Sequence, residues 1–245
     1  MKNETKNDWA LVTCVNDIDT LAKRLAASPC IQSGELPWIA CFNMKSAADA
    51  LDCGIRSFSD CKWLIWAHQD VYLPDGWLEG FKKATNDAAN TIPNLAITGV
   101  YGISTNNGAP IRAGKLLDRG KNLHEPQALP FIVDSLDELL IAIRIDSQLH
   151  FDQALGFDFY GTDIVLQASI RGKAAAVVEG YCEHWSGTPS VGPYSKVTID
   201  RIRQSSQVFE QKWAHRLPIS TPCFNINQVG DVSSFLSSLD SHDRS

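Results

Sequence analysis

Residues 63–78 of this chain read WLIWAHQDVYLPDGWL, the stretch that says most about its architecture. An apolar run ends at a single carboxylate, Asp70, and a Pro-Asp-Gly turn then leads into a Trp-Leu pair that can open a helix. Short apolar runs bounded by turn residues are typical of buried strands. Open α/β sheets bind ligands beyond the carboxyl ends of their strands. On an extended segment His68 and Asp70 point the same way, which suits a metal that holds a phosphorylated ligand.

Composition indicates an ordinary globular protein. The chain has 245 residues, of which 44% are hydrophobic and 20% charged, enough for one well-packed domain. The net charge of −6 and the absence of a Lys/Arg-rich stripe argue against a nucleic-acid partner. The seven cysteines contain no CxxC pair, so we expect reduced thiols rather than a zinc site.

The sequence predicts a cytoplasmic protein. The segment MKNETKND at the start is polar and lacks the apolar core of a signal peptide. No run of about 18 apolar residues is present to form a transmembrane segment. Nothing in the sequence indicates the oligomeric state.

Strands and helices alternate along the chain. Apolar runs predict strands at 9–15, 38–42, 62–67, 95–101, 139–145 and 174–178. Helical spacing predicts helices near 21–27, 46–58, 77–89, 163–170 and 198–213. Residues 102–130 carry Gly, Asn and Pro, and we expect an extended loop or a small insertion there. Such alternation indicates βαβ units and a mainly parallel sheet.

Several motifs together resemble a known family. HQDVYLPDGWLEGF at 68–81 looks like the metal-binding segment of family 2-like glycosyltransferases with a GT-A fold. FDQAL at 151–155, YGTDIVLQA at 160–168, Gly172 and HWS at 184–186 are similar to the family's second half, in the same order. The resemblance covers roughly residues 9–195 and matches a subset in which His-Gln-Asp replaces the usual Asp-x-Asp. It implies an α/β, GT-A-type, Rossmann-like sandwich whose central sheet is mixed, mainly parallel and flanked by helices.

The same resemblance predicts the domain organisation. We expect a single GT-A-like domain over 1–223, with a nucleotide-binding half at about 9–101 and an acceptor half at about 102–195. A C-terminal helix is expected at about 198–213. Residues 224–245 are rich in Asn, Ser and Asp, and we expect a polar tail that is mobile or peripheral.

The resemblance also implies a divalent metal, Mn²⁺ or Mg²⁺. Asp70 corresponds to the last carboxylate of the Asp-x-Asp motif, and a cation there would stabilise the charge on a departing nucleotide diphosphate. His184 follows the last strand, where a histidine commonly completes the family's metal site. A carboxylate with an imidazole suits Mn²⁺ somewhat better than an all-oxygen site does. A turn carboxylate and a surface histidine explain the same residues without a metal.

His68 departs from the family pattern because it replaces the first Asp of the motif. It could ligate the metal, or contact the ribose or nucleotide of the donor. A packed histidine at a strand end is the alternative. Losing the first carboxylate puts metal dependence in doubt.

Asp163 is the predicted general base. It stands where the family's Glu-Asp pair ends, at the start of a helix whose dipole favours the ionised form. Thr162 replaces the Glu of that pair, and Asp158 is the reserve candidate. Thr and Asp are also ordinary residues at a helix start, which alone explains both.

Donor and acceptor contacts are predicted from position. Asn16 and Asn43 follow the first two strands, where the resembling family contacts the base and ribose. Tyr160 and Trp185 could stack on a sugar of the acceptor, although aromatic residues are more often core.

Acidic residues precede the strand at 139–145. Asp134, with Asp137 and Glu138, falls where the family borders the acceptor side of the cleft. Solvated acids at a strand entrance explain them equally well.

The resemblance implies a glycosyltransferase that moves a sugar from a nucleotide-diphosphate donor to a hydroxyl acceptor such as a glycan, with inversion. A catalytically inactive GT-A-like binding module is the alternative, since the first Asp and the Glu are both replaced. A nucleotidyltransferase or phosphotransferase is disfavoured because no Gly-rich, Lys-bearing loop follows the first strand. The sugar, the base and the acceptor are not indicated.

Overall fold

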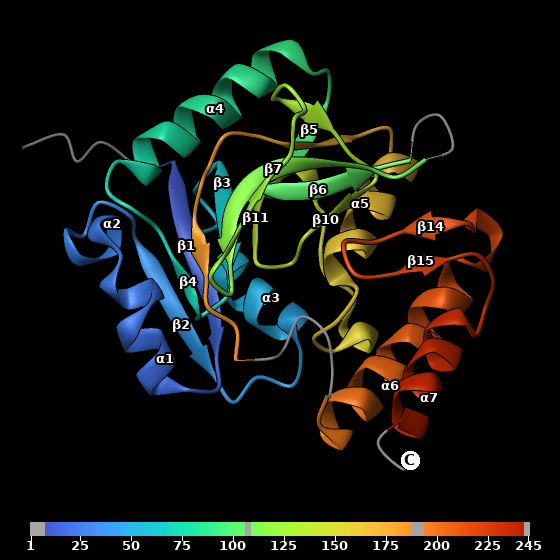
Figure 1. Ribbon diagram of the computed structural model, residues 1–245. Helices are drawn as coiled ribbons and strands as arrows, with labels where there is room; N and C mark the ends of the chain where they lie inside the picture. Colours follow the sequence, from blue (N-terminus) through green and yellow to red (C-terminus); the bar gives the residue numbers. More distant parts are fainter. Residues whose placement is uncertain (1–7, 106–108, 188–193, 243–245) are drawn as a thin grey trace, which may run out of the picture.

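The computed structural model describes residues 8–105, 109–187 and 194–242, and a seven-stranded sheet lies at its centre (Figure 1). The strand order is β2-β1-β3-β11-β5-β12-β9. The bounds are β1 Trp9–Val15, β2 Trp38–Phe42, β3 Trp63–Ala67, β5 Leu95–Gly99, β9 Phe131–Ile132, β11 Leu140–Arg144 and β12 Ala174–Val177. β1 is parallel to β2 and β3, and β5 to β12, whereas β11 and β9 are antiparallel to their neighbours. The predicted mixed, mainly parallel sheet is confirmed.

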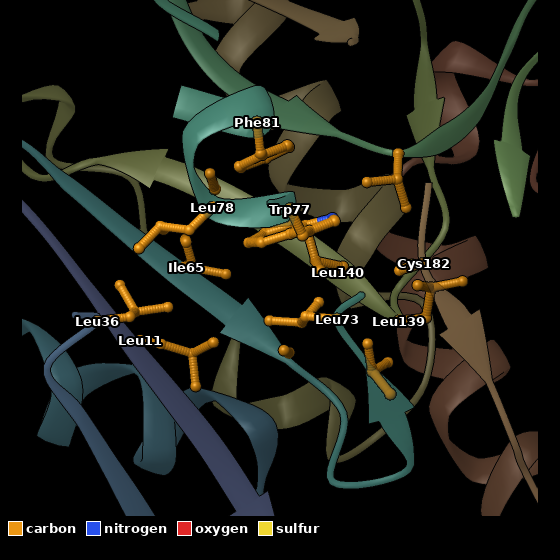
Figure 2. Packing of buried hydrophobic residues seen from close by; sticks show 14 of the residues in the cluster. Leu11, Leu36, Ile65, Leu73, Trp77, Leu78, Phe81, Leu139, Leu140 and Cys182 are labelled. Atoms are coloured by element: carbon orange, nitrogen blue, oxygen red, sulfur yellow. The ribbon is translucent and has the colours of Figure 1, made fainter. Parts of the chain in front are cut away.

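Both faces of this sheet are buried, which explains why its strands read as continuous apolar runs. In β3, Trp63 and Ile65 belong to one hydrophobic cluster, and Leu64 and Trp66 belong to the other. Helices α1 Ile18–Lys23, α2 Pro29–Gln32 and α4 Trp77–Thr91 cover the first face, and α3 Ala47–Ser57 and α5 Tyr160–Ile170 cover the second. Figure 2 shows the side chains of α4 packed over the first face.

A second, six-stranded sheet has the order β10-β6-β7-β13-β4, with β8 paired to β7. Its bounds are β4 Val71–Tyr72, β6 Tyr101–Ser104, β7 Ile111–Asp118, β8 Lys121–His124, β10 Ser135–Leu136 and β13 Glu183–His184. Of the two alternatives expected for 102–130, an extended loop is therefore wrong, and a small insertion stays a prediction. β7 fully buries few residues, such as Ala113 and Leu116, so the apolar periodicity is too weak to reveal a strand. Arg119 and Gly120 form its hairpin turn, both with positive φ, as two-residue hairpins prefer.

The C-terminal residues form a further layer beside the sheet, coloured orange to red in Figure 1. It contains α6 Lys196–Lys212, β14 Ile219–Ser220, β15 Asn225–Ile226 and α7 Asp231–His242. Ile226, Val232 and Leu236 are buried in its hydrophobic cluster. The polar tail expected from residue 224 onward is thus packed up to at least Leu239. Ser and Asp residues outnumber the apolar side chains in this segment, so its composition did not predict helix α7.

The remaining helices are short. The 3₁₀ helices are η1 Leu25–Ala27, η2 Ile145–Ser147, η3 Gln153–Leu155 and η4 Ala214–Arg216. The predicted helices are present with shifted ends, and α5 starts three residues before the expected Asp163. Across the described ranges, every helix falls short of the length and apolarity needed to cross a membrane.

Two helical glycines differ in how closely the sheet approaches them, and this gives the first prediction. A Cβ on Gly54 of α3 would lie 2.8 Å from two atoms of Val12, whereas a Cβ on Gly80 of α4 would meet nothing within 4 Å. Alanine is the better helix former, so Gly80→Ala should stabilise by about 0.5–1 kcal/mol. Gly54→Ala should instead destabilise by about 1–2 kcal/mol through overpacking. Urea unfolding of both variants tests this, and a stabilised Gly54→Ala variant would contradict the close packing of α3 on β1.

Candidate active site

Strand β13 brings three distant segments together at one end of the second sheet. It lies between β4 and β7, with His184 opposite both Val71 and Asp118. The backbone continues this pairing, because Trp185 N donates to Asp70 O at 3.0 Å and Arg119 N donates to His184 O at 2.9 Å. Asp70, Asp118 and His184 therefore converge.

Three side chains here could hold a metal. His184 Nε2 lies 3.4 Å from Asp70 Oδ1, and His68 Nδ1 lies 3.9 Å from the same oxygen. One ligand atom from each of the three residues falls within 4.8 Å of the others. Within the described residues, Asp70 Oδ1 and His184 Nε2 are buried and make no hydrogen bond. Buried polar atoms normally have a partner, so a cation bound between them fits this donor set.

The second ring nitrogen of each histidine is fixed by another residue. His184 Nδ1 lies 2.8 Å from Asp118 Oδ1, and His68 Nε2 lies 2.6 Å from the Tyr160 hydroxyl. When Nδ1 donates to a carboxylate, Nε2 presents its lone pair to a metal. Asp118 was missed in the sequence because it precedes a hairpin turn, where Asp is common. Tyr160, predicted to stack on an acceptor sugar, is only 1% exposed and turns its hydroxyl toward His68 instead.

Opposing charges set the protonation states of the cluster. Burial lowers the pKa of His184, but the hydrogen bond with Asp118 and the close carboxylate of Asp70 raise it to about 9. Burial raises the pKa of Asp70, but the close imidazoles of His184 and His68 bring it to about 2. Burial lowers the pKa of His68, against the charge of Asp70. At neutral pH a metal must therefore displace a proton from His184 to bind.

The His-Gln-Asp segment is a turn and not the predicted extended strand end. Val71 N donates to His68 O at 3.2 Å, which closes the turn. The two side chains still face each other because the chain reverses between them. Gln69 accepts from the backbone N–H of Asn16 and Asp17, each at 3.1 Å, and donates to the Asn16 side chain. This joins the end of β3 to the end of β1.

A cavity of about 840 Å³ opens beside the cluster. The residues that follow β1, β2 and β3 form one wall, among them Asn16, Asn43, His68 and Asp70. Asn43 has a φ of 56°, a conformation that Asn adopts more readily than most residues. The predicted donor-binding residues and the predicted metal ligands thus share one cavity. The opposite wall includes apolar residues of the C-terminal layer: Ile202, Phe224, Phe235 and Leu239.

Asp163, the predicted general base, lies outside this cavity. It is 0% exposed, and its carboxylate accepts from Trp213 Nε1 at 2.8 Å and from Gln167 Nε2 at 2.7 Å. Lys212 Nζ also lies 2.7 Å away. Almost every face of α5 is buried, and position 163 faces the C-terminal layer, so the structure does not bring Asp163 together with the other predicted site residues. Thr162 lines the cavity instead.

The reserve candidate, Asp158, does line the cavity. Its two oxygens are held by Arg201 in a bidentate pair at 2.9 and 3.0 Å. Ser205 Oγ donates to it at 3.3 Å. Both carboxylate oxygens of Asp158 are thus already engaged by side chains of α6.

Two predicted acceptor residues also lie elsewhere. Asp134 accepts from the backbone N and the hydroxyl of Thr105, at 2.7 and 2.9 Å, and lines a separate cavity of about 310 Å³. The guanidinium group of Arg24 lies over the Trp185 ring, 4.2 Å from the ring centre. The indole N–H of Trp185 donates to the Glu183 carboxylate at 2.9 Å. Neither residue lines the larger cavity. Both were inferred from position along the chain, which does not reveal side-chain direction.

Sequence comparison with known proteins does not place the chain in a family. No family model matches the chain. A Fuscovulum blasticum protein described as ATP synthase subunits region ORF 6 is 27% identical over 156 residues, covering 62% of this chain. The chain spans 61% of the length of that relative.

Among solved structures, GalNAc-T7 with UDP, GalNAc and Mn²⁺ matches over 97% of this chain and 55% of its own. The TM-score is 0.51 at 10% identity, which shows a shared GT-A-type fold. Staphylococcus aureus TarS 1–349 with UDP matches over 86% of this chain and 72% of its own, with a TM-score of 0.45 at 8% identity.

The raised pKa of His184 predicts how the metal-free fold depends on pH. A group whose pKa rises from 6.5 to about 9 on folding stabilises the fold fully below pH 6.5 and loses that contribution as pH rises through about 9. The loss is of the order of 3 kcal/mol. Denaturant unfolding in EDTA between pH 6 and 10 measures it. His184→Gln should flatten the decline in the free energy of unfolding with rising pH, and the exposed His215→Gln control should not. An equal decline in both variants would contradict the assignment of this pH dependence to His184.

Asp163→Asn should lower stability without removing any group from the cavity. Lys212 loses one carboxylate partner but keeps Asp152 at 2.6 Å, so we expect a loss of about 2 kcal/mol, below the usual cost of breaking a buried pair. Nucleotide binding and turnover per folded molecule should stay within about twofold. Abolished turnover in a folded Asp163→Asn variant would restore Asp163 as the base.

Proposed function

We propose that this protein is a metal-dependent glycosyltransferase that transfers a sugar from a nucleotide-diphosphate donor to a hydroxyl acceptor. The observation that carries the proposal is a pair of buried ligand atoms, Asp70 Oδ1 and His184 Nε2, which lie 3.4 Å apart and, within the described residues, make no hydrogen bond. They lie beside a large cavity at the strand ends. The shared fold with GalNAc-T7, a protein crystallised with UDP, GalNAc and Mn²⁺, supports it.

His68, Asp70 and His184 would hold the cation, and their mixed nitrogen and oxygen donors favour Mn²⁺ over Mg²⁺. A bound divalent ion stabilises the negative charge that develops on a diphosphate leaving group. Asp118 and Tyr160 hold the two imidazoles in position from behind. The His-Gln-Asp segment then serves as the counterpart of Asp-x-Asp, with one imidazole in place of a carboxylate.

The donor and the acceptor would occupy opposite parts of the cavity. The half at about 9–101 supplies Asn16 and Asn43 for the base and ribose, and Gln69 fixes the Asn16 side chain. The half at about 102–195 and the layer from residue 196 onward form the acceptor side. Transfer would be a single displacement with inversion, for which the acceptor hydroxyl must lose its proton to a base in the cavity.

Metal-dependent nucleotide binding tests this proposal. In the presence of Mn²⁺, one of a panel of nucleoside diphosphates should raise the melting temperature, and EDTA should abolish the shift. Asp70→Asn and His184→Ala should remove the shift, whereas the exposed Asp146→Asn control should keep it. Asp118→Asn should weaken Mn²⁺ binding by about 10–100-fold, as loss of a residue that orients a metal ligand does.

A shift that survives EDTA or Asp70→Asn would contradict the metal site. Release of a nucleoside diphosphate from the matching nucleotide sugar then separates an enzyme from the inactive binding module. Binding without any such release would favour the module.

A further inference from the structure

Glu138 is a cavity residue that the predicted site left without a role. It lies between β10 and β11, and its backbone carbonyl accepts from Trp66 Nε1 at 3.2 Å and from the Tyr160 hydroxyl at 3.4 Å. The same hydroxyl lies 2.6 Å from His68 Nε2. The backbone of Glu138 is therefore fixed relative to the metal cluster.

The Glu138 side chain lies against the start of α5. Its Oε1 accepts from the Gly161 N–H at 3.1 Å. A Cβ on Gly161 would lie 2.8 Å from Glu138 Cγ and 2.6 Å from the Leu136 carbonyl oxygen, so only glycine permits this approach. The carboxylate thus sits beside Thr162, the position at which α5 has a hydroxyl and no acidic group of its own.

Glu138 also differs from the other cavity carboxylates in its partners. Asp158 is paired with Arg201, Asp118 with Arg119 and His184, and Asp70 with the two histidines. Within the described parts of the chain, Glu138 makes no ion pair and its Oε2 receives no hydrogen bond. Asp137 shares the cavity, and its Oδ1 accepts from the Leu139 N–H at 3.1 Å.

The surroundings of Glu138 favour its proton-bound form. Burial raises its pKa well above the usual value, and the charges of Asp158 and Asp137 raise it further, against the Gly161 N–H and Arg201. The Tyr160 hydroxyl lies beside the backbone carbonyl of Glu138. A base whose pKa is raised toward the working pH takes up a proton more readily than an ordinary carboxylate.

We propose that Glu138 is the general base of the transfer reaction, and this rests on the function proposed above. The acceptor oxygen forms a bond to the anomeric carbon while the bond from that carbon to the diphosphate oxygen breaks. The bonding pair leaves with the diphosphate, and the hydroxyl proton passes to Glu138 Oε2. The carboxylate that α5 lacks at position 162 is supplied by a neighbouring loop.

Glu138→Gln keeps the shape of the side chain, and the Gln oxygen can still accept from the Gly161 N–H. The variant therefore tests the proton transfer separately from the stability of the fold. We expect kcat to fall by about 10²–10⁴-fold with the donor selected by the binding screen. Binding of the nucleoside diphosphate with Mn²⁺ should stay within about threefold, and the melting temperature at pH 7.5 should not fall. Removing a carboxyl that burial disfavours when ionised costs the fold nothing at that pH.

Three further variants separate this role from a structural one. Glu138→Asp should retain partial activity with a shifted acidic limb in the dependence of kcat on pH, which a merely structural role would leave in place. Asp137→Asn, which alters another carboxylate of the cavity, should lower kcat by less than Glu138→Gln does, and the exposed Glu79→Gln should match wild type.

The outcomes distinguish the two proposals. Unchanged kcat in Glu138→Gln, or a larger loss in Asp137→Asn, would overturn the role of Glu138 and leave the proposed function standing. Wild-type protein that neither binds a nucleoside diphosphate with Mn²⁺ nor turns over any nucleotide sugar would overturn the proposed function, and the role of Glu138 with it.

Discussion

Two half-buried carboxylates hold one buried imidazole between them, and the candidate site is built around that contact. Asp118 fixes Nδ1 of His184 at 2.8 Å, and Asp70 faces Nε2 at 3.4 Å. Two negative charges in a largely buried place are costly unless a positive charge offsets them. In the metal-free protein the proton on His184 supplies that charge, and a divalent ion would supply more of it. The same residues are thus arranged for exchange between a proton and a metal.

Residues of both sheets line the cavity. In the central sheet, the parallel strands β1, β2 and β3 are followed by Asn16, Asn43 and His68, which line the cavity on its proposed donor side. The second sheet supplies Asp118 and His184 through the pairing of β13 with β7. The contacts of the buried Asp163 with Lys212 and Trp213 join α5 to the end of α6, and this helps to position the apolar residues of the C-terminal layer. We expect Asp163 to contribute to the shape of the site rather than to its chemistry.

The sequence predicted best what local patterns encode. Runs such as WLIWA and LLIAIRI predict strands because both faces of the central sheet are buried, and Asp70 and His184 follow such runs or stand at their ends. Asp118 could not be predicted as a site residue because its role arises from the pairing of β7 with β13. This pairing brings it into contact with His184, which lies 66 residues away in the sequence. The burial of Asp163 away from the cavity could not be predicted, because a position in the first turn of a helix does not reveal which side faces the cavity. Glu138 was seen only as an acid at a strand entrance, since its approach to Gly161 depends on tertiary packing.

Anomalous diffraction at the manganese edge, from crystals grown with Mn²⁺ and the nucleoside diphosphate that binds, tests the central claim most directly. The account predicts one strong peak within bonding distance of Asp70 Oδ1 and His184 Nε2, next to the diphosphate and facing His68. A nucleotide bound in the cavity with no peak at these atoms, or a peak elsewhere, would contradict it.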